Sequence, residues 1–247
     1  MCCLFLAASS TVAIAQTNVV DLVNPIIGTN GMGHTFPGAC VPFGLVQLSP
    51  DTDTIPHNVD GKYQPRSYEY CTGYQHKDSS IVGFSHTHFS GTGHSDLGDI
   101  LIMPTTGTLK LNPGTATNPD GGYRSRFSHD TEISRPGYYE VMLADYGVKA
   151  QLTTTQRVGI HKYTYPTNIE NQRIILDMIH GIYNYDGKVL WTNIRVENDT
   201  LVTGYRITNG WARTNYTYFA MSFSKPITHY GCEEKARVNY RGGYSKF

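Results

Sequence analysis

Short runs of alternating or β-branched residues follow one another from about residue 98 onward. Gly, Asn, Asp and Pro fill the turns between these runs, and a spacing of roughly ten residues is typical of an antiparallel sandwich or barrel. We expect strands at Ile100–Met103, Tyr138–Ala144, Val148–Thr155, Val158–Tyr165, Arg173–Ile179, Val189–Val196, Leu201–Thr208 and Tyr216–Phe223.

One of these runs also indicates which of its faces meets the core. Val148, Ala150, Leu152 and Thr154 alternate with polar residues, and successive side chains of a strand point to opposite faces. We therefore expect this strand to bury a single face. No segment keeps a 3.6-residue apolar period over three turns with caps at both ends, so helices are expected only as short connectors.

The first hundred residues have a different pattern, in which Gly, Asn and Pro dominate long loops. Residues 24–40, 49–53 and 70–74 carry this character. Loops of this length in a compact domain are usually functional or disordered, and the aromatic and apolar residues within them argue against disorder. We therefore expect one β domain whose recognition elements lie in its N-terminal half.

The charge balance excludes the usual partners of strongly basic domains. The chain has 20 Lys plus Arg against 20 Asp plus Glu, so its formal net charge is zero. A nucleic-acid-binding domain normally carries a basic excess, because phosphate contacts need cations. Nucleic acid is therefore not an expected partner. The 25 Gly and 18 Tyr favour short strands joined by many turns.

The N-terminus resembles a secretory signal. Residues 1–15 carry no charge, and their apolar core ends in the small-residue pattern Ala13-Ile14-Ala15. This core is too short to span a bilayer, which needs about 20 apolar residues. We expect a signal peptide over residues 1–15, cleavage before Gln16, and a soluble protein that is exported to the periplasm or the extracellular space.

Few cysteines remain once this signal is removed. Cys40, Cys71 and Cys232 permit at most one disulfide, so the domain is not a cysteine-stapled scaffold. A Cys40–Cys71 pair is compatible with export. Buried free thiols suit a domain with a sizeable core better.

Histidines and carboxylates gather in one segment of the N-terminal half. In residues 83–99, His86 and His88 have a strand-like i, i+2 spacing, and Asp96 and Asp99 follow a glycine turn. Three alternatives stay open: ligation of zinc or another transition metal, a hydrogen-bonded loop that rigidifies a site, and recognition of a hydroxyl-rich ligand. The spacing of Asp96 and Asp99 also allows the acid and base of an inverting glycosidase, although Gly98 favours a turn that separates them.

Aromatic residues are interleaved with Asn, Asp, Gln and His in the same half. Sugar rings have apolar C–H faces and hydroxyl edges, so aromatic residues beside carboxylates and amides suit a carbohydrate site. The alternative is an ordinary aromatic core. The residues concerned are Phe36, Phe43, Tyr63, Tyr68, Tyr70, Tyr74, Phe84 and Phe89.

Five ordered segments of the N-terminal half form a distinctive series of motifs: Val23-Asn-Pro-Ile-Ile-Gly-Thr29, His34-Thr-Phe-Pro-Gly-Ala39, Val41-Pro-Phe-Gly-Leu-Val-Gln-Leu-Ser-Pro-Asp-Thr52, Gly73-Tyr74 and Ile81 to Asp99. Together these motifs resemble the N-terminal domain of glycoside hydrolase family 92, a family of calcium-dependent exo-α-mannosidases found in bacteria that degrade N-glycans and yeast mannan.

This resemblance implies a mainly β fold, an antiparallel β-sandwich of the galactose-mutarotase-like supersandwich type with long N-terminal loops, over residues 16–247. In the family an (α/α)6 barrel follows the sandwich, and the active site lies between the two. The resemblance places the general acid, the general base and most calcium ligands in that barrel, which is absent here. It therefore implies no catalytic residue and no metal ligand in this chain.

The resemblance also implies which residues contact the sugar. They are Phe36, Pro37, Gly38, Asp51, His86, Asp96 and Asp99, with His94 placed to sense the leaving-group sugar. The expected partners are a mannose-containing glycan and the absent barrel domain.

The expected function is that of the substrate-pocket domain of a secreted inverting exo-α-mannosidase, inactive by itself. Two rivals are a stand-alone carbohydrate-binding sandwich and a metal-dependent hydrolase built on His86, His88, Asp96 and Asp99.

Overall fold

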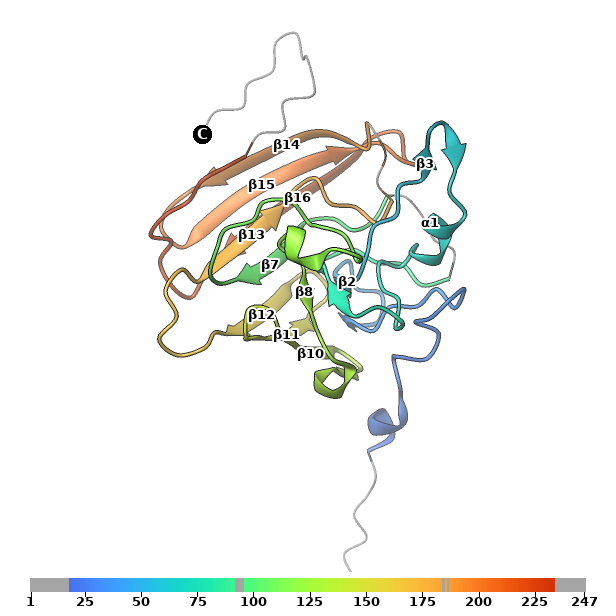
Figure 1. Cartoon of the computed structure of the whole chain (residues 1–247), viewed down its shortest axis with the longest axis horizontal. Helices are drawn as coiled ribbons and strands as arrows, with labels where there is room; N and C mark the ends of the chain where they lie inside the picture. Colours follow the sequence, from blue (N-terminus) through green and yellow to red (C-terminus); the bar gives the residue numbers. More distant parts are fainter. Residues whose placement is uncertain (1–17, 92–95, 184, 186, 234–247) are drawn as a thin grey trace, which may run out of the picture.

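The computed structural model describes residues 18–91, 96–183, 185 and 187–233, and these residues fold mainly into antiparallel sheets. The central sheet has five strands in the order β1-β2-β6-β7-β13. Figure 1 labels β2, β7 and β13 of this sheet. Their bounds are Ala39–Cys40, Gln47–Asp51, Gly83–Ser85, Leu101–Thr105 and Arg173–Asp177.

A second sheet packs against the central one. It has the order β12-β11-β10-β9, with β9 at Ile133–Arg135, β10 at Tyr138–Leu143, β11 at Val148–Thr154 and β12 at Gly159–Thr164. Every second residue of β11, from Val148 to Thr154, is buried, which confirms the single core face expected from the sequence. The main core lies between the two sheets and includes Leu48, Phe84, Met103, Tyr139, Val141, Ala150 and Leu152.

A third sheet, β14-β15-β16, lies on the other side of β7 and β13 in Figure 1. Its strands are Val189–Val196, Leu201–Thr208 and Asn215–Ser222, paired as an antiparallel meander. Two small ribbons complete the strands: β3 (Asn58–Val59) with β4 (Lys62–Tyr63), and β5 (Ser80–Ile81) with β8 (Ser125–Arg126).

The helices among the described residues are short connectors, as expected. They are α1 (Arg66–Glu69) and the 3-10 turns η1 (Val19–Leu22), η2 (Pro119–Gly121) and η3 (His129–Thr131). In the part of the chain that the structure describes, no helix is long and apolar enough to cross a membrane. The expected signal peptide lies outside the described residues.

The strand predictions for the C-terminal half and the mainly β, antiparallel sandwich class are confirmed. The N-terminal half contributes more strand than its loop-rich sequence indicated, because β1, β2 and β6 enter the central sheet. Strand β2 is buried from Leu48 to Asp51, so it shows no alternation of apolar and polar residues.

The cysteines differ partly from the expectation. Cys71 is buried, as expected, whereas Cys40 and Cys232 lie at the surface. Cys40 carries a free thiol, so the Cys40–Cys71 disulfide does not form in this structure.

Candidate functional site

The register of the central sheet brings several loops to one of its ends. Strand β6 ends at Ser85, which pairs with Ser49, while the neighbouring β7 begins at Leu101, which pairs with Asp177 at the end of β13. The chain therefore leaves or enters three adjacent strands at the same end of the sheet. The histidine-rich loop after β6 and the loop after β13 meet there.

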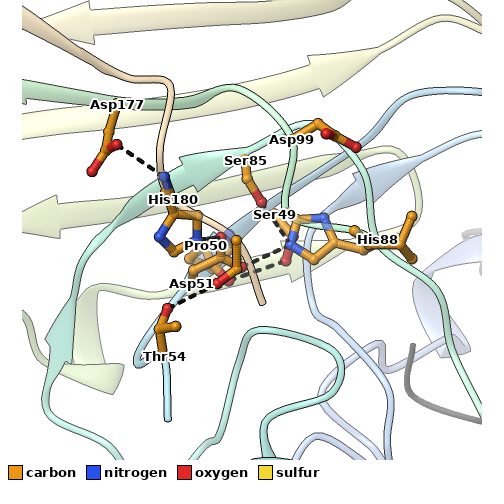
Figure 2. Close-up of polar contacts among 12 residues, drawn as sticks. Ser49, Pro50, Asp51, Thr54, Ser85, His88, Asp99, Asp177 and His180 are labelled. Atoms are coloured by element: carbon orange, nitrogen blue, oxygen red, sulfur yellow. Dashed lines mark hydrogen bonds and ion pairs between the residues drawn. The ribbon is translucent and has the colours of Figure 1, made fainter. Parts of the chain in front are cut away.

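A buried carboxylate, Asp51 of β2, lies between two histidine rings that come from the loops after β6 and β13 (Figure 2). Nε2 of His88 is 2.9 Å from Oδ1 of Asp51, and Nε2 of His180 is 2.7 Å from Oδ2. The three residues are 0%, 2% and 6% exposed, so the cluster lies beneath the loops and not on the surface. It joins strand β2 to the two loops that leave β6 and β13.

The hydrogen bonds of His88 define its charge. Its Nδ1 is 2.7 Å from the carbonyl oxygen of Gln47, and its Nε2 faces the carboxylate of Asp51. Both partners are acceptors, so each ring nitrogen carries a hydrogen and the ring is an imidazolium. Burial by itself would raise the pKa of Asp51, but the two histidines outweigh it and hold this pKa well below its usual range. The cluster is therefore a buried ion pair with its charges compensated.

Gly73 makes room for this carboxylate. A Cβ at residue 73 would lie 2.0 Å from Oδ1 of Asp51, and the residue has a φ of +81°. Only glycine combines this backbone conformation with so close an approach.

We therefore expect Gly73→Ala to destabilise the fold by about 2–5 kcal/mol, because left-handed strain of about 1–2 kcal/mol adds to overpacking of about 1–3 kcal/mol. The measurement is urea unfolding. Gly61→Ala is the matched control, since Gly61 has a φ of +73° but nothing within 4 Å of the position that a Cβ would take. Equal losses in the two variants would contradict the close contact with Asp51.

A second buried ion pair lies beside the first. Arg206 of β15 is fully buried, and its Nε donates to Oδ1 of Asp99 over 2.8 Å. Its Nη1 donates to the carbonyl oxygens of both Met178 and His180. The hydroxyl of Thr87 donates to the second carboxylate oxygen of Asp99 over 2.7 Å. This network joins the third sheet to the same two loops.

Lys188 adds another buried cationic group next to this network. It is 1% exposed, and its Nζ has a long contact of 3.3 Å with the carbonyl oxygen of Leu97. Burial, together with the nearby charge of Arg206, lowers the pKa of Lys188 to about 7. The charge of this region therefore changes near neutral pH.

His86 belongs to a separate chain of hydrogen bonds. Its Nδ1 is 2.6 Å from the carbonyl oxygen of Ile100, and its Nε2 is 3.0 Å from Nε2 of His161. The hydroxyl of Tyr163 lies 2.7 Å from Nδ1 of His161. All of these contacts are satisfied when both rings are neutral, with His161 donating to His86. Burial lowers the pKa of both histidines, and in His161 the neighbouring His86 lowers it further.

We expect this histidine pair to make the fold acid-sensitive. The folded pKa values lie below the unfolded value of about 6.5, so the stabilisation is complete above that pH and is lost as the pH falls below it. The loss is at most about 1.4 kcal/mol per pH unit for each histidine. Urea unfolding at pH 7.5 and 5.5 measures it.

In His161→Gln the stability should fall less steeply between these two pH values than in the wild type. His229→Gln, at an exposed position, should keep the wild-type slope. An unchanged slope in His161→Gln would contradict the neutral pair.

The first predicted loop packs onto the Asp51 cluster. The half-buried ring of Phe36 lies 5.2 Å from the ring of His88, centroid to centroid. Pro37 and Gly38 are buried, and a Cβ at Gly38 would lie 2.3 Å from the carbonyl oxygen of Leu48. Of these three residues, Phe36 has the side chain that reaches the surface.

The predicted aspartates have different surroundings. Asp99 is 1% exposed, and both of its carboxylate oxygens are bonded within the chain, to Arg206 and Thr87. Asp96 is half-buried, and its carboxylate accepts hydrogen bonds from the backbone N–H groups of Trp211 and Ala212 over 2.7 and 2.9 Å. Asp96 therefore orders the loop between β15 and β16. His94 lies outside the described residues.

The metal-dependent hydrolase expected as a rival does not fit these contacts. His88 bonds to Asp51, His86 pairs with His161, and Asp99 binds Arg206. Asp96 bonds to the loop at residues 210–212. Each of the four side chains therefore has a different partner, and they do not form one set of metal ligands.

The aromatic residues of the N-terminal half divide between core and surface. Tyr70, Tyr74 and Phe84 are buried, as the core alternative expected. Phe43, Tyr63 and Phe89 are exposed, with Phe36 and Tyr68 between these extremes. The exposed side chains can stack on the C–H face of a sugar, whereas the buried ones stabilise the fold.

Sequence reasoning missed His180, Arg206 and Lys188. Their positions in the sequence carry no motif, and His180 lies 129 residues from its partner Asp51. A cation within a predicted strand is the one available signal, because Arg206 shares a face of β15 with the uncharged Val202, Gly204 and Thr208.

Comparison with known proteins identifies the fold. The glycosyl hydrolase family 92 N-terminal domain matches residues 22–245. A family GH92 alpha-mannosidase from Bacteroides thetaiotaomicron, solved in complex with mannoimidazole, is 44% identical with a TM-score of 0.76 over 85% of this chain. A GH92 inverting mannosidase from the same organism is 27% identical over 84% of this chain, with a TM-score of 0.60. The chain therefore belongs to glycosyl hydrolase family 92 and corresponds to its N-terminal domain.

A sequence relative from Arthroderma benhamiae, described as an uncharacterized secreted glycosidase, is 29% identical over 65% of this chain. The chain spans only 19% of that relative and 26% of the alpha-mannosidase solved with mannoimidazole. The matched region is thus a small part of each of these proteins.

Proposed function

We propose that this chain is the substrate-pocket domain of an exported, inverting exo-α-mannosidase that acts on α-mannosides of N-glycans or mannan. The observation that carries the proposal is the 44% identity, over 85% of this chain, to an alpha-mannosidase solved with mannoimidazole. The inverting mannosidase and the secreted glycosidase among its relatives support the stereochemistry and the export.

In this proposal the loops at the end of the central sheet contribute to the mannose site. Phe36 offers a half-buried ring for stacking on a sugar face, backed by Pro37 and Gly38. Asp96, His86 and His94 remain proposed polar contacts. Asp51 and Asp99 contribute to the proposed site indirectly, because their buried ion pairs with His88 and Arg206 hold the loops in position.

The general acid and base are proposed to lie in a domain outside this chain. Asp51 and Asp99 are each bonded to cationic side chains inside the protein, so neither is placed to exchange a proton with a substrate. Calcium prefers six to eight oxygen ligands, and these two carboxylates are already engaged. Asp51 and Asp99 are therefore not available as calcium ligands, and in this proposal calcium is bound mainly by the other domain.

The test compares the 247-residue chain with the longest polypeptide encoded by the same reading frame, on a panel of aryl glycosides with and without calcium. We expect the longer protein alone to release mannose, from α-mannosides only, and to lose this activity when calcium is chelated. Cleavage of a different glycoside, or a reading frame that ends at residue 247, would contradict the proposal.

A further inference from the structure

A group of metal-ligating side chains lies away from the Asp51 cluster and shares no residue with it. His76 precedes β5, while His129 and Glu132 belong to η3 and the residue that ends it. Each offers one donor atom, and these atoms all lie within 4.8 Å of one another. The two imidazole rings face each other with their centroids 4.0 Å apart. Two imidazole nitrogens and one carboxylate oxygen therefore lie close together.

Glu132 is held in place by the protein core. Its carboxylate accepts hydrogen bonds from the hydroxyl of Tyr74, at 2.9 and 3.0 Å, and from that of Tyr139, at 2.6 Å. Both tyrosines are fully buried. The side chain of Glu132 is 3% exposed and that of His129 is 37% exposed. The carboxylate is thus fixed from the inside while one histidine remains accessible to solvent.

His76 has a fixed backbone and a weakly engaged ring. Its N–H donates to the carbonyl oxygen of Thr29 over 2.8 Å, which anchors the loop. Its Nδ1 is 3.5 Å from the hydroxyl of Tyr74, at the limit of a hydrogen bond. The ring of His76 lies beside another imidazole, and among the described residues its side chain has only this one long hydrogen bond. It is therefore suited to bind a metal ion.

We propose that His76, His129 and Glu132 bind a divalent transition metal ion, with Zn²⁺ as the best-fitting probe. Imidazole and carboxylate are ligands of Zn²⁺, and donors about 2.0–2.2 Å from a tetrahedral ion lie about 3.3 Å apart. The donor atoms now lie within 4.8 Å of one another, so binding would draw the three side chains together around the ion. Nδ1 of His129 now lies 2.7 Å from Oε2 of Glu132, and the metal would displace the proton between them.

The buried tyrosines complete the site. Hydrogen bonds from protein groups to a ligating carboxylate orient it and strengthen its binding of metal. Tyr74 and Tyr139 supply such bonds to Glu132, and three protein ligands leave a fourth position for water. The ion would cross-link the loop before β5 to the turn before β9. This inference does not depend on the proposed mannosidase activity.

The first test is calorimetric titration of the purified chain with ZnCl2, with CaCl2 as a separate titrant. We expect one equivalent of Zn²⁺ to bind and Ca²⁺ not to bind at this site. His129→Ala should weaken zinc binding by more than the roughly 10–100-fold that loss of an outer partner causes. His229→Ala, at an exposed histidine elsewhere, should bind zinc as the wild type does.

The second test uses Co²⁺, whose visible absorption reports its coordination. We expect an intense tetrahedral spectrum in the wild type, its loss in His76→Gln, and a roughly 10–100-fold weaker affinity in Tyr139→Phe. Absence of zinc binding in the wild type would overturn the proposal. So would an affinity and spectrum that persist unchanged in both His129→Ala and His76→Gln.

Discussion

Asp51→Asn is expected to lower the free energy of unfolding by about 3–5 kcal/mol, the cost of removing one partner from a buried ion pair. His88 and His180 both donate to the carboxylate of Asp51. A neutral amide leaves the imidazolium of His88 without a counter-charge, and its NH2 group faces an N–H donor. The measurement is urea unfolding at pH 7.5, followed by circular dichroism.

Asp60→Asn is the matched control for this substitution. Asp60 is exposed, and its φ of +52° is one that asparagine also tolerates. We expect a change within about 0.5 kcal/mol there. A loss below about 1 kcal/mol in Asp51→Asn would mean that the carboxylate is not the charge partner of the two histidines.

Arg206→Met is expected to cost a similar amount, about 3–5 kcal/mol, because it leaves Asp99 as a buried and unpaired charge. The substitution also removes the donors to the carbonyl oxygens of Met178 and His180. These carbonyls belong to the loop that carries His180. The variant should therefore lose the hydrogen bonds that connect the third sheet to the Asp51 cluster. Urea unfolding again measures the loss.

Two further variants separate charge from packing in this prediction. Arg195→Met removes an arginine from the neighbouring strand β14, where the side chain is 75% exposed and pairs with Glu197. We expect less than about 1 kcal/mol there. Adding Asp99→Asn to Arg206→Met should recover part of the loss, because the unpaired charge is gone. A double variant as unstable as the sum of the singles would contradict this explanation.

The strands that the sequence predicted correctly are those with one face in the core. In β11 the residues from Val148 to Thr154 alternate between buried and half-buried positions, and that period is visible in the sequence. Strands β1 and β6 are two and three residues long, and β2 is buried along most of its length. Neither length nor periodicity could distinguish these segments from the loops around them.

The candidate site could be predicted only in part, for a different reason. The loop motifs indicated Asp51 and Asp99 as important residues, but a motif does not say whether a carboxylate faces a ligand or a buried cation. That depends on His180 and Arg206, which lie 129 and 107 residues away from Asp51 and Asp99 in the sequence. Long-range pairing of this kind has no local signature, so the sequence could not indicate that Asp51 and Asp99 take part in buried ion pairs.

The central claim is that this sandwich is one part of an inverting mannosidase and has no turnover of its own. Proton NMR during incubation with an aryl α-mannoside and calcium tests it most directly, because the spectrum shows both the amount and the anomer of the mannose released. We predict no mannose from the 247-residue chain and, from the full-length product of its reading frame, β-mannose as the first product. Steady release by the short chain, or α-mannose as the first product of the long one, would contradict the account.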